Sequence, residues 1–582
     1  GGWRISHDRR MLTLAFSEPL LAASVSNAAF TVSGTAVVGA TLLSNATNVS
    51  LRLADPLSAG TAYALSLKVS DCATPANVLT LSDYAFTPAA WAGTPIALIR
   101  GGVEPPGPSS RRCPFAVTEI NHTPAARSDG RDLRFIELYN SNPYFQDIGN
   151  YRFSGAFGYT VPSGTVMTAN SYLVIAPSPA DIAAVYGVTN VLGGFDASAF
   201  DGTSAITIND ELGAWLTTVA YADNPPWPVA ADGSGHSLVL ARPSYGEREA
   251  DGWAASARLG GSPGSAEPAR PTAYEAVMFN EVLAHSGSTA GFVELHNVST
   301  ATVSLAGCVL KRGDPASAGF VMPAGAVLPP DGFCAFDETA FGFKIAGTGE
   351  RLWLFAPASE GGAVIDAVRL DDQEMGVAYG RYPDGAAAWN RLESPTPDAL
   401  NAPRRAADVV INEIMYNPIS GNKDEEYVEL YNPGTNAVDL SGWKLGGGVS
   451  YTCSETLAAG GYLIVPRDRA AFAALYPEQA AQTARGSFGG SLANGRGTVT
   501  LSKPVPVMDT QDPLAPAVVT NNTVVERVTY RGGGEWGSLA DGGGSSLERV
   551  DPRSDPSLAR SWAASDETQK SGWTTIEFTG KI

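Results

Sequence analysis

Six glutamates recur in pairs at matching places along the chain. Paired carboxylates can act as general acid and general base in catalysis. In each pair the two glutamates lie on successive predicted strands: Glu119 with Glu137, Glu281 with Glu294, and Glu413 with Glu429. Two carboxyl groups that face a common cleft serve as acid and base in glycosidases. Carboxylate oxygens are also ligands that calcium prefers. The third interpretation is structural, with hydrogen bonds to every carboxylate, because an unsatisfied buried carboxylate is costly.

The repetition favours the structural interpretation. A fold that requires a hydrogen-bonded carboxylate repeats it in every copy, whereas three near-copies of one active site in a single chain would be unusual. We therefore predict that Glu137, Glu294 and Glu429 accept hydrogen bonds from backbone amides of the following turn, or from the asparagine that ends the strand. No catalytic residue, metal ligand or cofactor is assigned, and calcium remains the alternative.

The glutamates belong to a sequence pattern that occurs three times. The fullest copy reads VINEIMYNP at 410–418, YVELYN at 427–432 and DLSGWKL at 439–445. The other copies begin near residues 117 and 279, so each repeat is as long as a domain. Strand alternation places Val428 and Leu430 on the core face and Glu429 on the opposite face.

This pattern resembles the lamin tail domain, an immunoglobulin-like β-sandwich that also occurs in secreted bacterial proteins. The resemblance implies three tandem copies, which we expect at 114–267, at 274–404 (a shorter and divergent copy) and at 407–575. The resemblance to that family implies no catalytic residue. The expected fold class is all-β, with tandem Ig-like antiparallel β-sandwiches and only short helices.

The amino-terminal part has a different pattern. Alternating segments separated by Gly, Pro and Asn turns predict an antiparallel sandwich over residues 1–95. The stretches FSEPL at 16–20 and LSAGTAYALSL at 57–67 resemble the bacterial Ig-like modules of surface proteins, which carry no chemistry. A linker is expected over 96–113, and residues 576–582 alternate like the start of a further segment.

The charge balance excludes several partners. The 582 residues include 39 Lys and Arg against 59 Asp and Glu, which gives a formal net charge of −20. Such a chain repels a phosphate backbone, so nucleic acid is not an expected partner. No apolar run approaches the roughly 18 residues that a membrane-spanning helix needs, so membrane insertion is not expected.

The cysteines and histidines point to no metal site. The five cysteines form no CxxC pair, and no two of the five histidines lie four residues apart. Two disulfides are alternatives to buried thiols: Cys308 with Cys334 within the middle repeat, and Cys72 with Cys113 between the first module and the first repeat. Cys453 would then be left over.

Loop tryptophans are the candidates for ligand contact. Trp227 and Trp536 precede similar glycine-rich stretches of the first and third repeats. An exposed indole there would stack on sugar rings, and the alternative is a buried plug. GGSPG at 260–264 satisfies G-x-S-x-G, but the proline after Ser262 lacks the N–H of an oxyanion hole, so a turn is predicted.

Together these features predict a non-catalytic, secreted bacterial protein that is extracellular or attached to the cell surface. Its role would be structural or adhesive, through spacing, protein partners, or self-association into a filament or surface array. The alternative is an accessory portion of a larger secreted hydrolase or kinase-like protein that binds cell-surface glycan.

Overall fold

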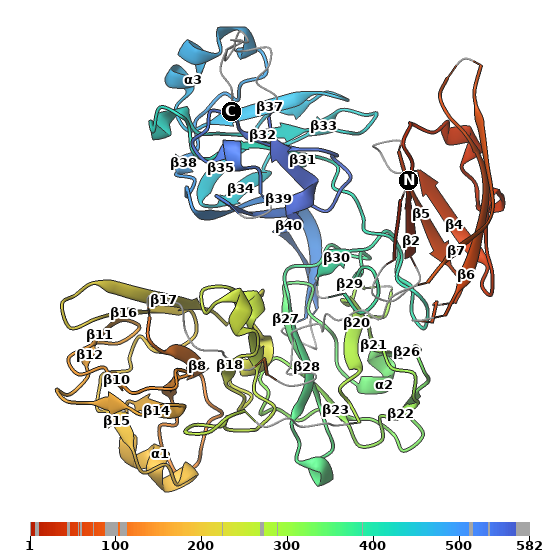
Figure 1. The fold of residues 1–582 in the computed structure, drawn as a ribbon. Coiled ribbons are helices and arrows are strands. Elements are labelled where there is room, and N and C mark those ends of the chain that lie inside the picture. Colours follow the sequence, from red (N-terminus) through yellow and green to blue (C-terminus); the bar gives the residue numbers. More distant parts are fainter. Residues whose placement is uncertain are drawn as a thin grey trace, which may run out of the picture.

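In the computed structural model the described residues form four modules of packed β-sheets with only short helices (Figure 1). The predicted all-β fold class is confirmed. The structure describes residues 2–565 except for 6–10, 43–46, 56, 59–60, 74, 88–102, 105–112, 224, 268–272, 288, 387, 511–515 and 534–535. Most of the expected linker and all of 576–582 lie outside this part. Within it, no helix has the length and apolar character needed to cross a membrane.

The amino-terminal Ig-like module packs a four-stranded sheet, in the order β1-β2-β5-β4, against a three-stranded sheet, β3-β6-β7. Buried leucines and valines fill the space between the sheets. Arg52 Nη2 donates to Leu400 O at 3.3 Å, so this module contacts the middle sandwich. Its strands are β1 Gly2–Ile5, β2 Met11–Ala15, β3 Phe30–Val32, β4 Val37–Leu42, β5 Asn48–Leu53, β6 Tyr63–Ser70 and β7 Val78–Phe86.

The first sandwich pairs a six-stranded sheet, β15-β14-β9-β8-β18-β19, with a four-stranded sheet, β12-β11-β16-β17. The short helix α1 ends at Gly187, whose φ of 72° suits a residue without a side chain. The elements are β8 Ala116–Asn121, β9 Phe135–Asn140, β10 Gln146–Asp147, β11 Arg152–Gly155, β12 Tyr159–Thr160, β13 Val166–Met167, β14 Ser171–Ala176, α1 Pro179–Tyr186, β15 Val191–Gly193, β16 Ser204–Asn209, β17 Trp215–Tyr221, β18 Leu238–Leu240 and β19 Trp253–Ala255.

The second sandwich pairs the sheet β26-β21-β20-β29-β30 with the sheet β24-β23-β27-β28. Its elements are β20 Val277–Leu283, β21 Phe292–Asn297, β22 Val303–Ser304, β23 Val309–Arg312, β24 Phe320–Val321, β25 Val327–Leu328, β26 Phe333–Asp337, α2 Glu338–Phe341, β27 Glu350–Phe355, β28 Val364–Leu370, β29 Tyr379–Arg381 and β30 Trp389–Arg391.

The third sandwich pairs the sheet β37-β32-β31-β41-β42 with the sheet β38-β35-β34-β39-β40. Its elements are β31 Val410–Met415, β32 Tyr427–Tyr431, β33 Val438–Asp439, β34 Lys444–Gly447, β35 Val449–Thr452, β36 Thr456–Leu457, β37 Tyr462–Pro466, α3 Arg469–Leu475, β38 Gly489–Gly490, β39 Arg496–Asp509, β40 Ala517–Arg531, β41 Leu547–Arg549 and β42 Trp562–Ala564.

The three sandwiches share one strand order. The sheet that carries the glutamates contains β14-β9-β8-β18-β19 in the first, β26-β21-β20-β29-β30 in the second and β37-β32-β31-β41-β42 in the third. The opposite sheets share β11-β16-β17, β23-β27-β28 and β34-β39-β40 in the same way. Each sandwich therefore ends with a hairpin whose first strand pairs with the opening strand.

The predicted faces of the repeated strands are confirmed. Val428 and Leu430 are fully buried in the core of the third sandwich. Trp443 and Leu445 are buried on either side of the exposed Lys444. Neither proposed disulfide is present, because Cys72, Cys308 and Cys334 are free thiols. Cys308 lies in the core of the second sandwich, where the thiol packs as a small apolar group.

Candidate functional site

The two loop tryptophans are not exposed. Trp227 is 7% and Trp536 is 8% exposed, and both belong to the cores of their sandwiches. Trp227 lies against Trp253, with ring centroids 5.9 Å apart. Both indoles are therefore buried plugs, which is the alternative to a sugar-stacking surface. Within the described part of the chain, the tryptophan with more than a third of its surface exposed is Trp215, at 42%.

Each glutamate pair lies directly across two antiparallel strands, at a β-bulge. Glu119 faces Glu137, Glu281 faces Glu294 and Glu413 faces Glu429, and in each case the register shifts just before the first glutamate. The shift leaves one extra residue on the opening strand: Thr118, Asn280 and Asn412. A bulge re-aims the side chains next to it. The recurring Thr-Glu or Asn-Glu sequence is thus the sequence of a bulge.

The extra residue of each bulge donates to the second glutamate. Thr118 Oγ1 lies 2.7 Å from the Oε1 atom of Glu137. The equivalent contacts, from Asn280 Nδ2 to Glu294 and from Asn412 Nδ2 to Glu429, are both 2.9 Å. The extra residue of the bulge therefore provides one of the hydrogen bonds that the second glutamate of the pair needs.

The loop after the last strand closes over the pair in the first two sandwiches. Ser262 N donates to Glu119 at 3.0 Å, and Gly264 N donates to Glu137 at 2.7 Å. In the second sandwich Thr396 N donates to Glu281 at 3.1 Å and Asp398 N donates to Glu294 at 2.7 Å. The GGSPG stretch at 260–264 is thus a turn, as predicted, and it binds buried carboxylates.

The sequence correctly predicted that backbone amides of a turn donate to the glutamates, but it placed this turn at the wrong position in the chain. In the first two sandwiches turn amides do hold the second glutamate, but they come from the closing loop and not from the turn that follows the strand. The asparagine that ends the strand does not contribute as expected. Asn432, for example, donates through Nδ2 to backbone carbonyls, including that of Asn436 at 2.8 Å. Only the shared closing sequences, Ser-Pro-Gly at 262–264 and Thr-Pro-Asp at 396–398, could have signalled the loop.

The pair in the third sandwich has different partners. Glu413 accepts from Tyr427 OH at 2.6 Å and from Ser546 Oγ. Ser546 corresponds to Ser237 of the first sandwich, which donates to Glu119. Both glutamates are half-buried here. The residues that follow Ser565 lie outside the described part of the chain.

Burial raises the pKa of five of the six carboxyl groups. Loss of solvent raises the pKa of Glu119 to about 8, of Glu281 to about 7, of Glu294 to about 8 and of Glu429 to about 7, and hydrogen bonds to each oppose the shift. The pKa of Glu137 is also raised, by burial and by the neighbouring Glu119 charge. For Glu119 and Glu294 the raised pKa favours the neutral form at neutral pH.

We expect the second sandwich to lose stability as the pH rises from about 5 to about 8. The folded pKa of Glu281, about 7, exceeds its ordinary value of 4.5, so the folded state binds more protons in this window and the free energy of unfolding falls as the pH rises. For Glu281 the loss is about 3 kcal/mol. Urea titrations across this range should show a shallower loss for Glu281→Gln, and an unchanged loss would contradict the expectation.

A buried ion pair supports the bulge in two of the sandwiches. Arg381 pairs with Asp366 at 3.3 Å, and Arg549 pairs with Glu526 at 2.6 Å, with all four side chains at most 5% exposed. Asp366 accepts from Phe279 N at 2.9 Å, and Arg381 Nε donates to Phe279 O at 2.6 Å. The ion pair thus forms hydrogen bonds with the backbone N–H and C=O of Phe279, which the bulge removes from the hydrogen bonding between strands. In the first sandwich Leu240 occupies the arginine position.

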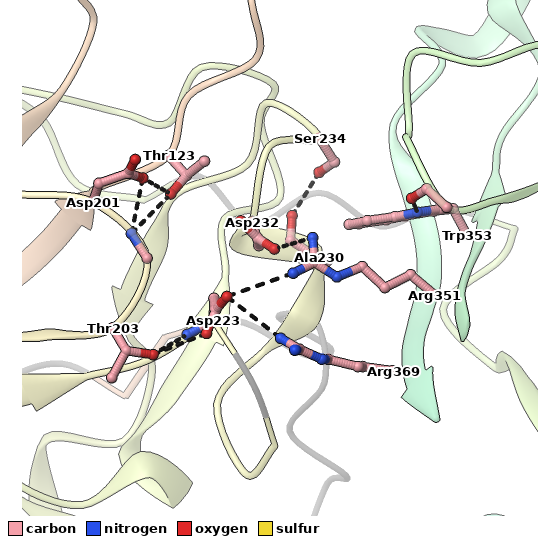
Figure 2. A network of polar contacts seen from close by, with 12 residues as sticks. Thr123, Asp201, Thr203, Asp223, Ala230, Asp232, Ser234, Arg351, Trp353 and Arg369 are labelled. Atoms are coloured by element: carbon pink, nitrogen blue, oxygen red, sulfur yellow. Dashed lines mark hydrogen bonds and ion pairs between the residues drawn. The ribbon is translucent and has the colours of Figure 1, made fainter. Parts of the chain in front are cut away.

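The first and second sandwiches meet at a junction of ion pairs (Figure 2). Arg351 Nη1 lies 2.5 Å from Asp232, and Asp223 lies 3.5 Å from Arg351 and 3.4 Å from Arg369. The two arginines come from neighbouring strands, β27 and β28, and reach across to the first sandwich. Asp223 therefore bridges two guanidinium groups of the next module.

An apolar cluster lies beside these ion pairs. Trp353 is fully buried against Val229 and Ala230 of the 3-10 helix η3 (Val229–Ala231). His236 is 1% exposed, and its Nε2 accepts from Val364 N at 3.0 Å. Its Nδ1 lies 2.6 Å from Ser256 O. The two sandwiches thus share a core and a backbone hydrogen bond, which fixes their relative orientation.

The second and third sandwiches are joined through the long hairpin β39–β40. Gly347 N donates to Met508 O at 2.7 Å, and Met375 N donates to Pro506 O at 3.2 Å. Arg527 pairs with Asp371 at 2.9 Å. The third sandwich also contacts the first, because Glu249 pairs with Arg531 at 2.7 Å and with Arg496 at 3.3 Å. The three sandwiches therefore contact one another pairwise.

A cavity of about 920 Å³ opens where the three sandwiches meet. Its lining includes Asp232 of the first, Thr348 and Arg369 of the second, and Asn522 and Arg527 of the third. None of the six paired glutamates lines it. Thr348 Oγ1 is buried there without a hydrogen-bond partner among the described residues. Guanidinium, carboxylate, amide and hydroxyl groups at this cavity can bind a polar ligand.

Comparison with known proteins identifies two of the modules. The model of the Lamin Tail Domain family matches residues 402–532, and the model of the Bacterial Ig-like domain family matches residues 7–88. The chain therefore contains an Ig-like module and a lamin tail domain. The first two sandwiches are not matched by these models. A search of curated proteins found no match.

Two solved structures of surface-layer proteins show a distant likeness. One is the S-layer protein rSbsC(31-844), with 9% identity and a TM-score of 0.14, and the other is the surface layer protein SbsC, domains 1-6, with 9% identity and a TM-score of 0.11. Each alignment covers 88% of this chain and 65% of the other chain. At these TM-scores the likeness carries no argument about fold or function.

Proposed function

We propose that this chain is a non-catalytic, extracellular or surface-attached protein with a structural or adhesive role. Its three sandwiches would be tandem lamin-tail-like copies, of which the third is matched and the first two share its strand order. The match to a bacterial Ig-like domain supports a place at the cell surface. Partners would be proteins, including further copies of the chain.

The observation that carries this proposal is the state of the paired glutamates. Those of the first two sandwiches are at most 2% exposed and accept hydrogen bonds from the bulge and the closing loop. A general acid or base must reach its substrate, directly or through one water. These carboxyl groups are buried and hydrogen-bonded within the sandwiches and do not face a cleft.

The proposal predicts a rigid scaffold without turnover. Small-angle scattering of the whole chain should fit one compact arrangement of the three sandwiches, because ion pairs and apolar contacts fix each junction. Assays with polysaccharide, peptide and phosphoester substrates should show no hydrolysis above buffer. Turnover that is lost in Glu281→Gln or Glu119→Gln would overturn the non-catalytic assignment.

One observation favours the accessory glycan-binding alternative, namely the polar cavity between the three sandwiches. Affinity electrophoresis through polysaccharide gels separates the two proposals. The structural proposal expects no retardation. Retardation that is lost in Asn522→Ala, and kept in a control with the exposed Leu558→Ala, would favour the alternative.

A further inference from the structure

The two junctions between consecutive sandwiches use equivalent segments: in each, a loop segment of the earlier sandwich packs on a hairpin of the later one. In the first junction, the segment between β17 and β18 of the first sandwich packs on the hairpin β27–β28 of the second. In the second junction, the segment between β28 and β29 packs on the hairpin β39–β40 of the third. Each sandwich thus presents one face to the next and receives the previous one on another. Such a heterologous contact is repeatable without limit unless it closes into a ring.

The third sandwich has the same presenting segment, and it is uncovered. A parallel bridge joins Thr123 to Asp232 in the first sandwich and Asn417 to Asp541 in the third, which aligns the two segments. The 3-10 helix η9 (Ser538–Ala540) therefore corresponds to η3, and Leu539 takes the place of Ala230. Ala230 is 2% exposed because the second sandwich covers it, whereas Leu539 is 58% exposed.

The surroundings of Leu539 resemble a docking face. Ile419 is 72% exposed and lies close to Gly544 of the same segment. Asp541 is exposed and takes the place of Asp232, which Arg351 binds at the first junction. We call Ile419, Leu539 and Asp541 the presenting face. It combines two large exposed apolar side chains with one carboxylate, and the covered face at the first junction likewise combines apolar side chains with the carboxylate of Asp232.

The first sandwich has the matching receiving hairpin, and it is also uncovered. The register next to the bulge makes Trp215 on β17 the counterpart of Val364 on β28. Val364 is 5% exposed under the first sandwich, whereas Trp215 is 42% exposed. Leu212, at the turn of the same hairpin, is 87% exposed. Trp215 and Leu212 define the receiving face.

The receiving face carries a positive charge from a different element. Ala205 and Ala220 stand where Arg351 and Arg369 stand in the second sandwich. The guanidinium of Arg248 instead lies over the Trp215 ring, 5.6 Å from its centroid. An exposed tryptophan with a stacked arginine is suited to an apolar partner with a carboxylate.

We propose that the presenting face of one chain docks on the receiving face of a second copy, so that the chain associates head to tail. This inference rests on the proposed structural function and names its partner. Leu539 and Ile419 would cover Trp215, and Asp541 would pair with Arg248. The ion pair between Glu249 and Arg531 holds the first and third sandwiches together within a chain, and it leaves both faces exposed.

Sedimentation velocity over a concentration series up to about 1 mM tests this contact, because such concentrations populate weak complexes. The unmodified chain is expected to form species of increasing mass. Leu539→Glu and Trp215→Glu should each remain monomeric over the series. Leu475→Glu places the same charge on a half-exposed leucine at the end of α3 and should associate like the unmodified chain.

Mixing the two monomeric variants tests the direction of the contact. Leu539→Glu keeps a receiving face and Trp215→Glu keeps a presenting face, so an equimolar mixture should form a dimer and nothing larger. A monomeric unmodified chain at every concentration would overturn the inference. Association that both variants retain would also overturn it, while leaving a structural role intact. Circular dichroism confirms that each variant is folded.

Discussion

Replacing Arg549 with methionine is expected to lower the free energy of unfolding of the third sandwich by about 3–5 kcal/mol. Arg549 and Glu526 are at most 1% exposed, and the arginine also donates to Ser554 O. Without the guanidinium, Glu526 remains buried between the two sheets. It then keeps the hydrogen bond that it accepts from Ile411 N. Burial already raises the pKa of Glu526, so the lost partner leaves its charged form uncompensated.

A surface arginine provides the matched control. Arg527 neighbours Glu526 on β40, but its ion pair with Asp371 is more than half exposed on both sides. Arg527→Met should cost less than about 1 kcal/mol, because exposed pairs contribute little. Urea unfolding followed by tryptophan fluorescence measures both variants. The double variant Glu526→Gln with Arg549→Met should recover part of the loss. Equal effects of the two arginine substitutions would show that the buried pair does not stabilise the bulge.

Truncation of Trp353 to alanine is expected to loosen the first junction and to cost about 3–5 kcal/mol of stability. Its indole is fully buried between the first and second sandwiches, and its Nε1 donates to Gly313 O at 2.9 Å. The alanine variant leaves Val229 and Ala230 without their apolar partner. Small-angle scattering should report a larger radius of gyration, and limited proteolysis should cut near the junction.

Trp215→Ala is the control for this substitution. Trp215 lies on the equivalent hairpin of the first sandwich and is 42% exposed, so its removal opens no cavity. At a concentration where the chain is monomeric, its scattering should match that of the unmodified chain. If Trp353→Ala also leaves the scattering and the proteolysis pattern unchanged, the junction is held by its polar contacts, namely the ion pairs of Asp223 and Asp232 and the hydrogen bond to His236.

The faces of the strands could be predicted from the sequence because alternation is a local property. Val428 and Leu430 had to share a face, and the tertiary structure could only bury or expose that face. The class of fold followed from these local patterns together with the repeats.

The environment of the glutamates could not be predicted, because it depends on contacts between distant segments. Glu137 obtains a donor from Gly264, and no spacing rule links the two. Whether the loop tryptophans are exposed or buried could not be predicted for the same reason. A glycine-rich neighbourhood suggests a surface loop, but Trp227 turns inward onto Trp253. Domain boundaries and the number of lamin-tail copies remain predictions.

The order in which these contacts become available along the chain has a consequence for biosynthesis. The opening strands carry the glutamates, whereas Ser262 and Gly264, which hold them, come at the very end of the first sandwich. A ribosome that releases the chain from its amino terminus exposes the acidic strands long before their closing loop. The first sandwich can therefore complete the hydrogen bonds to its glutamates only when its final residues emerge.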